Sequence, residues 1–208
     1  MSTNQSNPKW EIIPQKTALL VIDMQNDFVE KGAIMEVPKA KTQVPKIKEL
    51  IKVCRNNGIP VTYTTHHTDP KLCALEIYAF PHLISAGMRS GTRGVEVVDE
   101  LAPNPNEYII KKHRFSAFYN TELETVLRGL KGSKEGSDAI DTLIICGTVT
   151  NICCESTARD AFYRDYKVVF GSDICSALSD EIHNATLANM EIFGRVLSLD
   201  EIFNNIIK

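Results

Sequence analysis

The sequence lacks the features of several classes of protein. No apolar run approaches the ~20 residues that span a bilayer, and residues 1–10 lack the basic and apolar regions of a secretory signal. A formal net charge of -3 leaves no basic excess to neutralise nucleic-acid phosphates. We therefore expect a cytoplasmic protein that binds neither membranes nor nucleic acid and acts on a small-molecule substrate.

Motifs for nucleotides and for structural metals are also missing. The chain has neither a GxGxxG fingerprint nor a Walker loop, and it contains no internal repeat. Its six cysteines show no paired CxxC spacing and are too few for a disulfide scaffold, which indicates reduced thiols. The sequence therefore predicts no cofactor.

What the sequence does contain is an alternation of apolar strand segments and amphipathic helices. The expected strands cover residues 17–22, 60–65, 107–111, 142–146, 166–170 and 195–199. The expected helices cover residues 39–57, 95–101, 152–163 and 180–193, with one more after a capping box at Thr121 and Glu124 and one at the end of the chain. Such alternation implies right-handed crossovers and a sheet covered on both faces. We expect a three-layer α/β/α fold with a mostly parallel, six-stranded, Rossmann-like sheet.

The length of 208 residues suits one well-buried domain and is short for two. Residues 1–16 are polar and contain two prolines, so we expect an N-terminal arm followed by a single domain over 17–208. Residues 66–94 show weak periodicity. Because long loops in compact domains are usually functional, we expect this segment to form a lid.

Reactive residues stand at the ends of three expected strands. Asp23 follows the first strand, Lys111 and Lys112 end the third, and Cys153 follows the fourth. Because ligands bind at the carboxyl ends of parallel strands, these side chains could converge. Alternation along the strand should turn only one of the two lysines inward, and the pattern alone leaves both open.

The surroundings of Cys153 are those of a nucleophile. Thr150 and Asn151 are residues that cap helices, which places Cys153 in the first turn of a helix. The positive end of the helix dipole would there lower the thiol pKa toward neutrality. The alternative is an inert packing cysteine, which is how we interpret Cys54 and Cys154.

Four stretches of the chain together resemble the isochorismatase-like cysteine hydrolases. They are LLVIDMQNDF (19–28), GTRGVEVVDELAP (91–103), IIKKHRFSAFYNTEL (109–123) and GTVTNICCESTARDAF (147–162). The family includes nicotinamidases, N-carbamoylsarcosine amidases, biuret hydrolases and ureidoacrylate amidohydrolases. The resemblance covers most of the chain and implies hydrolysis of a C–N bond through a thioester intermediate. It also implies a homodimer or homotetramer.

The resemblance implies a catalytic triad of Asp23, Lys112 and Cys153. Lys112 is preferred to Lys111 because the family places its lysine three residues before the aromatic residue of a [YF]-S-x-F element, here Phe115. In this scheme the aspartate is the general base, the cysteine is the nucleophile, and the lysine supplies positive charge.

A cis peptide bond between Thr148 and Val149 is also implied by the resemblance. Its purpose would be to direct the backbone N–H of Val149, together with that of Cys153, at the substrate oxygen. The two N–H groups would then form an oxyanion hole.

The segment after the second strand separates this chain from the nicotinamidases it resembles. Those enzymes hold a metal through a D-x-H element, whereas residues 65–70 here read THHTDP. His66, His67, Asp69 and His82 are ligand types for zinc, but their spacing is not that of a metal site. We therefore expect no metal.

The choice of substrate rests on similarity to one branch of the family. Cys153 favours C–N hydrolysis over the vinyl-ether cleavage of isochorismatases, which commonly lack the cysteine. The motifs look most like those of ureidoacrylate and carbamoyl-amide hydrolases, for which we expect an apolar wall from Phe28 and polar contacts from His66, His67 and Arg89. The alternatives are an isochorismatase, a nicotinamidase, or a catalytically silent member of the family that recruits a partner.

Overall fold

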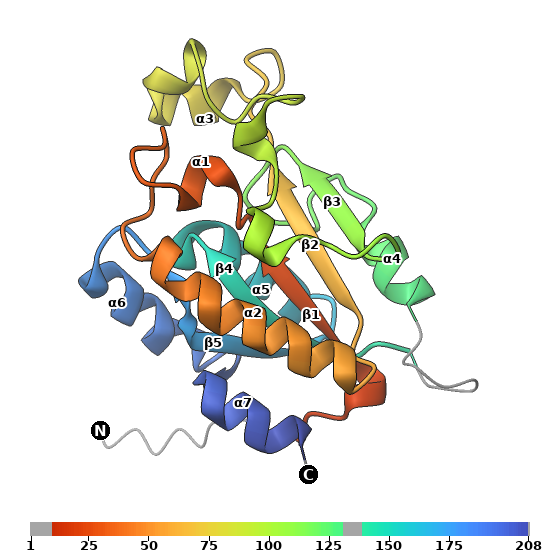
Figure 1. Cartoon of the computed structure of the whole chain (residues 1–208). Helices are drawn as coiled ribbons and strands as arrows, with labels where there is room; N and C mark the ends of the chain where they lie inside the picture. The colour runs from red at the N-terminus through yellow and green to blue at the C-terminus, as the bar shows by residue number, and fades with distance from the viewer. Residues whose placement is uncertain (1–9, 131–138, 208) are drawn as a thin grey trace.

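The computed structural model describes residues 10–130 and 139–207, which form a central sheet with helices on both of its faces (Figure 1). Of the predicted arm, residues 1–9 lie outside the described residues, and Ile12 is buried in the core. In the described part of the chain, no helix is both long enough and apolar enough to cross a membrane.

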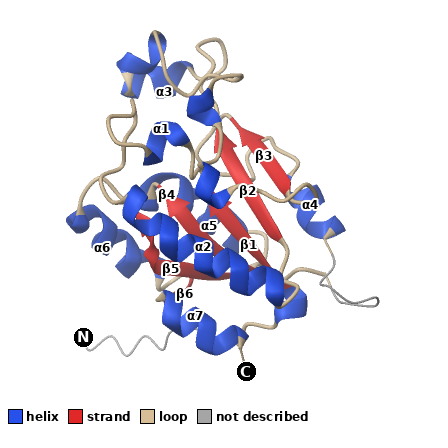
Figure 2. Cartoon of the chain, in the orientation of Figure 1, coloured by secondary structure: helices blue, strands red, loops and turns tan. Residues whose placement is uncertain are grey.

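The sheet has six strands, all parallel, in the order β3-β2-β1-β4-β5-β6 (Figure 2). The strands are β1 (Thr17–Ile22), β2 (Val61–His66), β3 (Tyr108–Lys112), β4 (Thr142–Thr148), β5 (Lys167–Ser176) and β6 (Gly194–Leu197). Every residue of β1 and β4 is buried, as expected for central strands covered on both faces. The predicted three-layer α/β/α fold is confirmed.

Alternate residues of β1 belong to two separate cores. Leu19 and Val21 pack with α2 (Ala40–Asn56) and α7 (Leu199–Ile206) on one face of the sheet. Leu20 and Ile22 pack on the other face with three helices: α4 (Leu123–Gly129), α5 (Glu155–Phe162) and α6 (Asp180–Met190). The period of two along the strand thus builds both layers from one short apolar run.

Two short helices lie beyond the carboxyl ends of the strands, α1 (Asn26–Val29) and α3 (Ala74–Ala79) (Figure 1). Helix α3 belongs to the predicted lid segment, which also contains a 3-10 helix over Pro81–Ile84. These elements cover the edge of the sheet where the candidate reactive residues stand.

Two predicted local structures are wrong. Residues 95–101 do not form a helix: separate 3-10 turns, Arg93–Val95 and Asp99–Leu101, flank Val97, which forms an antiparallel bridge with Gln25. The capping box at Thr121 is also absent. The Thr121 hydroxyl accepts from the backbone N–H of Leu123 at 3.2 Å and donates to the carbonyl of Ala117, so it stabilises the preceding turn.

Gly147 provides a test of the close approach between the two central strands. Its φ is +118°, and an added Cβ would lie 2.0 Å from the carbonyl oxygen of Ile22. We expect Gly147→Ala to lower the free energy of unfolding by at least about 2 kcal/mol, because both the backbone conformation and the space exclude a side chain. Denaturant unfolding followed by circular dichroism measures this change.

Gly129, at the end of α4, is the matched control. A Cβ added there would have no neighbouring atom within 4 Å, and the φ of Gly129 is not in the left-handed region. Gly129→Ala should leave stability unchanged or raise it by up to about 1 kcal/mol. Equal effects of the two substitutions would contradict the steric account of Gly147.

Candidate active site

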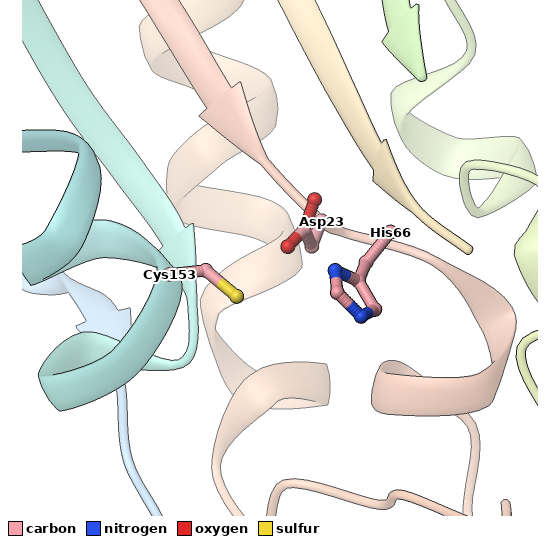
Figure 3. A group of neighbouring side chains, drawn as sticks. All are labelled: Asp23, His66 and Cys153. Carbon is pink, nitrogen blue, oxygen red and sulfur yellow. The ribbon is translucent and has the colours of Figure 1, made fainter. Parts of the chain in front are cut away.

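Asp23, Lys112 and Cys153 meet at the carboxyl ends of β1, β3 and β4. The Lys112 Nζ lies 2.7 Å from Asp23 Oδ2 and 3.3 Å from Cys153 Sγ. The side chains of Asp23 and Lys112 are 0% exposed, and Cys153 is 3% exposed. Figure 3 shows Asp23, Cys153 and His66 pointing toward one another from three separate segments.

The two adjacent lysines of β3 face opposite sides of the strand. Lys112 is fully buried, whereas Lys111 is exposed and its ammonium donates to Ser90 Oγ at 2.8 Å. Parallel pairing sets Lys112 beside His66 of β2, which brings its ammonium 3.1 Å from His66 Nδ1. The alternation of the strand therefore selects Lys112 for the site.

Asp23 is held in a left-handed backbone conformation, with a φ of 47°. A residue with a side chain adopts this conformation at a cost of order 1 kcal/mol or more, so the surroundings must hold it. Its backbone N–H donates to Thr64 Oγ1 at 3.1 Å, the Thr64 hydroxyl donates to Asp23 Oδ1 at 2.5 Å, and the Thr148 hydroxyl donates to the Asp23 carbonyl at 2.9 Å. These bonds leave Oδ2 directed at Lys112.

Cys153 lies in a π-helical turn, Thr150–Cys154, which continues into α5. The peptide bond between Thr148 and Val149, just before this turn, is cis. The predicted capping by Thr150 and Asn151 is wrong, because Val149 stands at the cap position and no side chain caps the turn. The Thr150 hydroxyl is instead 2.9 Å from His183 Nδ1.

The protonation of the site differs from the sequence-based expectation. Burial raises the pKa of the Cys153 thiol to about 12; Lys112 opposes this shift and Asp23 adds to it. Burial lowers the pKa of Lys112, but the negative charges of Asp23 and of a Cys153 thiolate outweigh it, so the net shift is upward. The predicted low thiol pKa is wrong, since loss of solvent outweighs the helix terminus. The resting site is a neutral thiol beside an ion pair.

A small, largely apolar pocket opens above Cys153, with an empty volume of ≈ 390 Å³ that includes its mouth. It is lined by Phe28, Met35, His66, Glu76, Phe80, Leu83, Met88, Phe115, Val149, Ile152 and Cys153. The expected apolar residue Phe28 lies in this wall. Almost half of the lining comes from the segment 66–94, so that segment shapes the pocket.

His66 connects the ion pair to a second carboxylate. Its Nδ1 lies 3.1 Å from Lys112 Nζ, and its Nε2 lies 3.1 Å from Glu76 Oε2. An ammonium can only donate, so Nδ1 accepts and Nε2–H donates to Glu76, which is the neutral tautomer of the imidazole. The sequence did not indicate Glu76, because α3 lies in a stretch with no periodic pattern or motif.

His67 and Arg89 do not line the pocket. The His67 ring is hydrogen-bonded to Ser90 Oγ at 2.9 Å and Thr65 Oγ1 at 3.1 Å, and burial lowers its pKa to about 4. The Arg89 guanidinium donates to the carbonyls of Thr68 at 2.6 Å and Gly87 at 3.0 Å. Arg89 therefore stabilises the backbone of the segment 66–94 and lies outside the lining of this pocket.

The candidate zinc ligands of the loop do not gather around one point. Asp69 caps the N–H of Lys71, and the His82 ring contacts Met35 Sδ on the exposed surface. Among the residues that the structure describes, the one group of potential ligands within 4.8 Å is Asp23, His66 and Cys153.

The ammonium of Lys112 already contacts all three members of that group. It lies 2.7 Å from Asp23 Oδ2, 3.1 Å from His66 Nδ1 and 3.3 Å from Cys153 Sγ. A metal cation bound by these three atoms would have to displace the Lys112 ammonium. The buried site would then hold two positive charges, the metal and the lysine, close together. These residues therefore do not fit a resident metal.

Comparisons with known proteins agree with this geometry. Residues 17–201 match the isochorismatase domain. A probable inactive nicotinamidase of Arabidopsis thaliana is 35% identical over 86% of this chain and 90% of its own length. A ureidoacrylate amidohydrolase of Agrobacterium fabrum is 31% identical over 90% of this chain and 89% of its own.

A solved structure matches along the whole chain. The cysteine hydrolase of Pseudomonas syringae pv. phaseolicola superposes with a TM-score of 0.90 at 31% identity, covering 100% of this chain and 99% of that one. The two chains therefore share one fold along their whole length. On the matched domain and these relatives, the chain belongs to the isochorismatase family, as its four motifs predict.

Proposed function

We propose that this protein is a cysteine amidohydrolase that cleaves a C–N bond in a small amide or carbamoyl amide through a thioester intermediate. The observation that supports it is the contact of Lys112 with both Asp23 and Cys153, at 2.7 Å and 3.3 Å, below an apolar pocket. A nucleophile, a base and a fixed positive charge are the groups that this chemistry requires.

The first step transfers a proton and forms a C–S bond. Because the thiol pKa is about 12, the proton leaves only as the substrate is attacked, and the Asp23 carboxylate, within 4.8 Å of Sγ, accepts it. The negative charge moves from Asp23 to the sulfur, and Lys112 stabilises it in either place. The sulfur then adds to the carbonyl carbon. The oxyanion accepts hydrogen bonds from the backbone N–H groups of Val149 and Cys153, both in the pocket lining.

The second half of the reaction returns the enzyme to its starting state. Asp23, now protonated, gives its proton to the leaving nitrogen, and the C–N bond breaks to release ammonia or an amine. Water then attacks the thioester while Asp23 accepts one of its protons. The acid product leaves and the thiolate regains its proton from Asp23.

The substrate class follows from the pocket and from one relative. The Agrobacterium relative is named for a carbamoyl substrate, and the residues around Cys153 do not fit a metal that would orient a pyridine nitrogen. We therefore propose a carbamoyl compound as the substrate, with residues 66–94 acting as the lid over it.

The name of the Arabidopsis relative, a probable inactive nicotinamidase, favours a second candidate function, a catalytically silent binding protein. A panel of amide substrates distinguishes this candidate from an active amidohydrolase.

The paired lysines test the role of the buried charge. Lys112→Met should abolish ammonia release, and it should lower the free energy of unfolding by about 3 to 5 kcal/mol because Asp23 is left as an unpaired buried charge. Lys111→Met, which changes an exposed neighbour, should alter the rate by less than about threefold. Steady-state rates and denaturant unfolding give the two readouts.

A double variant separates stability from catalysis in this experiment. Asp23→Asn with Lys112→Met removes both charges and should recover most of the lost stability without recovering activity. If Lys112→Met alone retained wild-type turnover, the lysine would have no part in the reaction.

The pH dependence of Cys153 alkylation tests the resting protonation state. Because the folded thiol pKa is about 12, the thiolate fraction is small at neutral pH and grows about tenfold for each pH unit below that value. The rate of modification by iodoacetamide, mapped by mass spectrometry, should therefore keep rising between about pH 7 and pH 9. Cys54, also shifted to about 12 by burial, reports the background in the same sample. A rate that levels off near neutral pH would show a thiolate in the resting enzyme.

The substrate class is tested by ammonia release from a panel without added metal. We expect an N-carbamoyl amino acid, biuret or ureidoacrylate to be hydrolysed faster than nicotinamide, with no loss of activity in chelator. Cys153→Ala should lower the rate by roughly 10⁴-fold or more, since the nucleophile is removed.

The proposal would be refuted if nicotinamide were the best substrate and activity were lost in chelator. Silence toward the whole panel would favour the binding protein, and isochorismate cleavage by Cys153→Ala would favour the vinyl-ether reaction.

A further inference from the structure

Glu76 lines the pocket and has one carboxylate oxygen without a hydrogen-bond partner. The residue is 8% exposed and lines the pocket. Its Oε2 accepts from His66 at 3.1 Å, while its Oε1 is buried and makes no hydrogen bond. Of the unpaired buried side-chain atoms in the described part of the chain, Oε1 is the one whose residue lines this pocket. An unmade hydrogen bond to a buried charged oxygen is costly, so the position calls for a donor from outside the protein.

No lysine or arginine of the described residues forms an ion pair with Glu76. Lys112 is paired with Asp23 at 2.7 Å, and the neutral His66 ring stands between Lys112 and Glu76. The neighbouring cation, Arg114, lines an adjoining hollow together with Glu76, but its guanidinium donates to the carbonyls of Leu72 and His113. Neither Lys112 nor Arg114 therefore forms an ion pair with Glu76, and Oε1 is left without a donor from the described residues.

We propose that Glu76 determines specificity by accepting a hydrogen bond from an N–H group at the end of the substrate that does not react. This inference rests on the proposed function and narrows its substrates to carbamoyl compounds whose far end carries an N–H group, such as biuret, in preference to those that end in a carboxylate, such as N-carbamoyl amino acids and ureidoacrylate. The scissile carbonyl lies at Cys153, and the other end of a short substrate reaches Glu76 across the face of His66. The carboxylate favours an ammonium or an amide N–H there and repels a carboxylate.

Three ureas of similar length test this selection. (2-Aminoethyl)urea, propylurea and N-carbamoylglycine carry the same ureido group and differ at the far end, which is an ammonium, a methyl group or a carboxylate. Each releases ammonia from one site, so kcat/KM values compare directly. The wild-type protein should prefer them in that order, because only the first donates to Oε1.

Glu76→Gln changes the chemistry of the position with little change in shape. The glutamine oxygen accepts from His66 Nε2–H, and its NH2 group then presents donors to the pocket. The ratio of kcat/KM for (2-aminoethyl)urea to that for N-carbamoylglycine should fall by about tenfold or more, the size expected for a hydrogen bond to a charged group. Glu49→Gln removes the same charge from an exposed site on α2 and should leave the ratio unchanged.

Binding to an inactive protein keeps this inference separate from the proposed function. In a Cys153→Ala background, calorimetry should give tighter binding of (2-aminoethyl)urea than of N-carbamoylglycine, with Glu76→Gln reducing the difference by a similar factor. If the wild type hydrolyses none of the ureas but binding follows this order, the proposed reaction fails and the role of Glu76 stands. If both ratios are unmoved by Glu76→Gln, the role assigned to Glu76 is wrong.

Discussion

The buried ion pair between Lys112 and Asp23 constrains most of the surrounding structure. Two opposite charges with no solvent exposure remain ionised only if each has close partners, because the low-dielectric interior penalises an isolated charge. Lys112 ends β3 and Asp23 follows β1, and because these strands are not neighbours in the sheet, β2 fills the space between them. It does so with Thr64, which donates to Asp23, and His66, which accepts from Lys112.

The ion pair also explains how an inert thiol could become a nucleophile. Burial keeps the Cys153 proton in place at rest, with a pKa of about 12. In the proposed reaction, proton transfer to Asp23 separates no new charge, since the negative charge only moves from one neighbour of Lys112 to another. An apolar pocket above the sulfur excludes water, so the energetic balance depends on these three groups and on the substrate that covers them.

The sequence predicted the parts of the site that stand at strand ends. Apolar runs located β1, β3 and β4, and the position after each run identified Asp23, the pair containing Lys112, and Cys153. The sequence could not predict properties that depend on which segments pack over the site in the folded protein. The thiol pKa follows from the burial of Cys153 in the folded protein, and Glu76 belongs to residues 66–94, a stretch without periodicity. The predicted capping by Thr150 was wrong because the turn begins at Thr150 itself and Val149 stands at the cap position.

The lining of the pocket divides by its position along the chain. Five lining residues come from one continuous stretch: His66, Glu76, Phe80, Leu83 and Met88. Cys153 follows β4, and Asp23 and Lys112, which are not in the lining, stand at the ends of β1 and β3. Almost half of the pocket lining is therefore encoded apart from the three residues of the candidate site. Replacement of a single segment could change what is recognised while the sheet keeps its reactive centre, so a family built on this plan can diversify in substrate without rebuilding its chemistry.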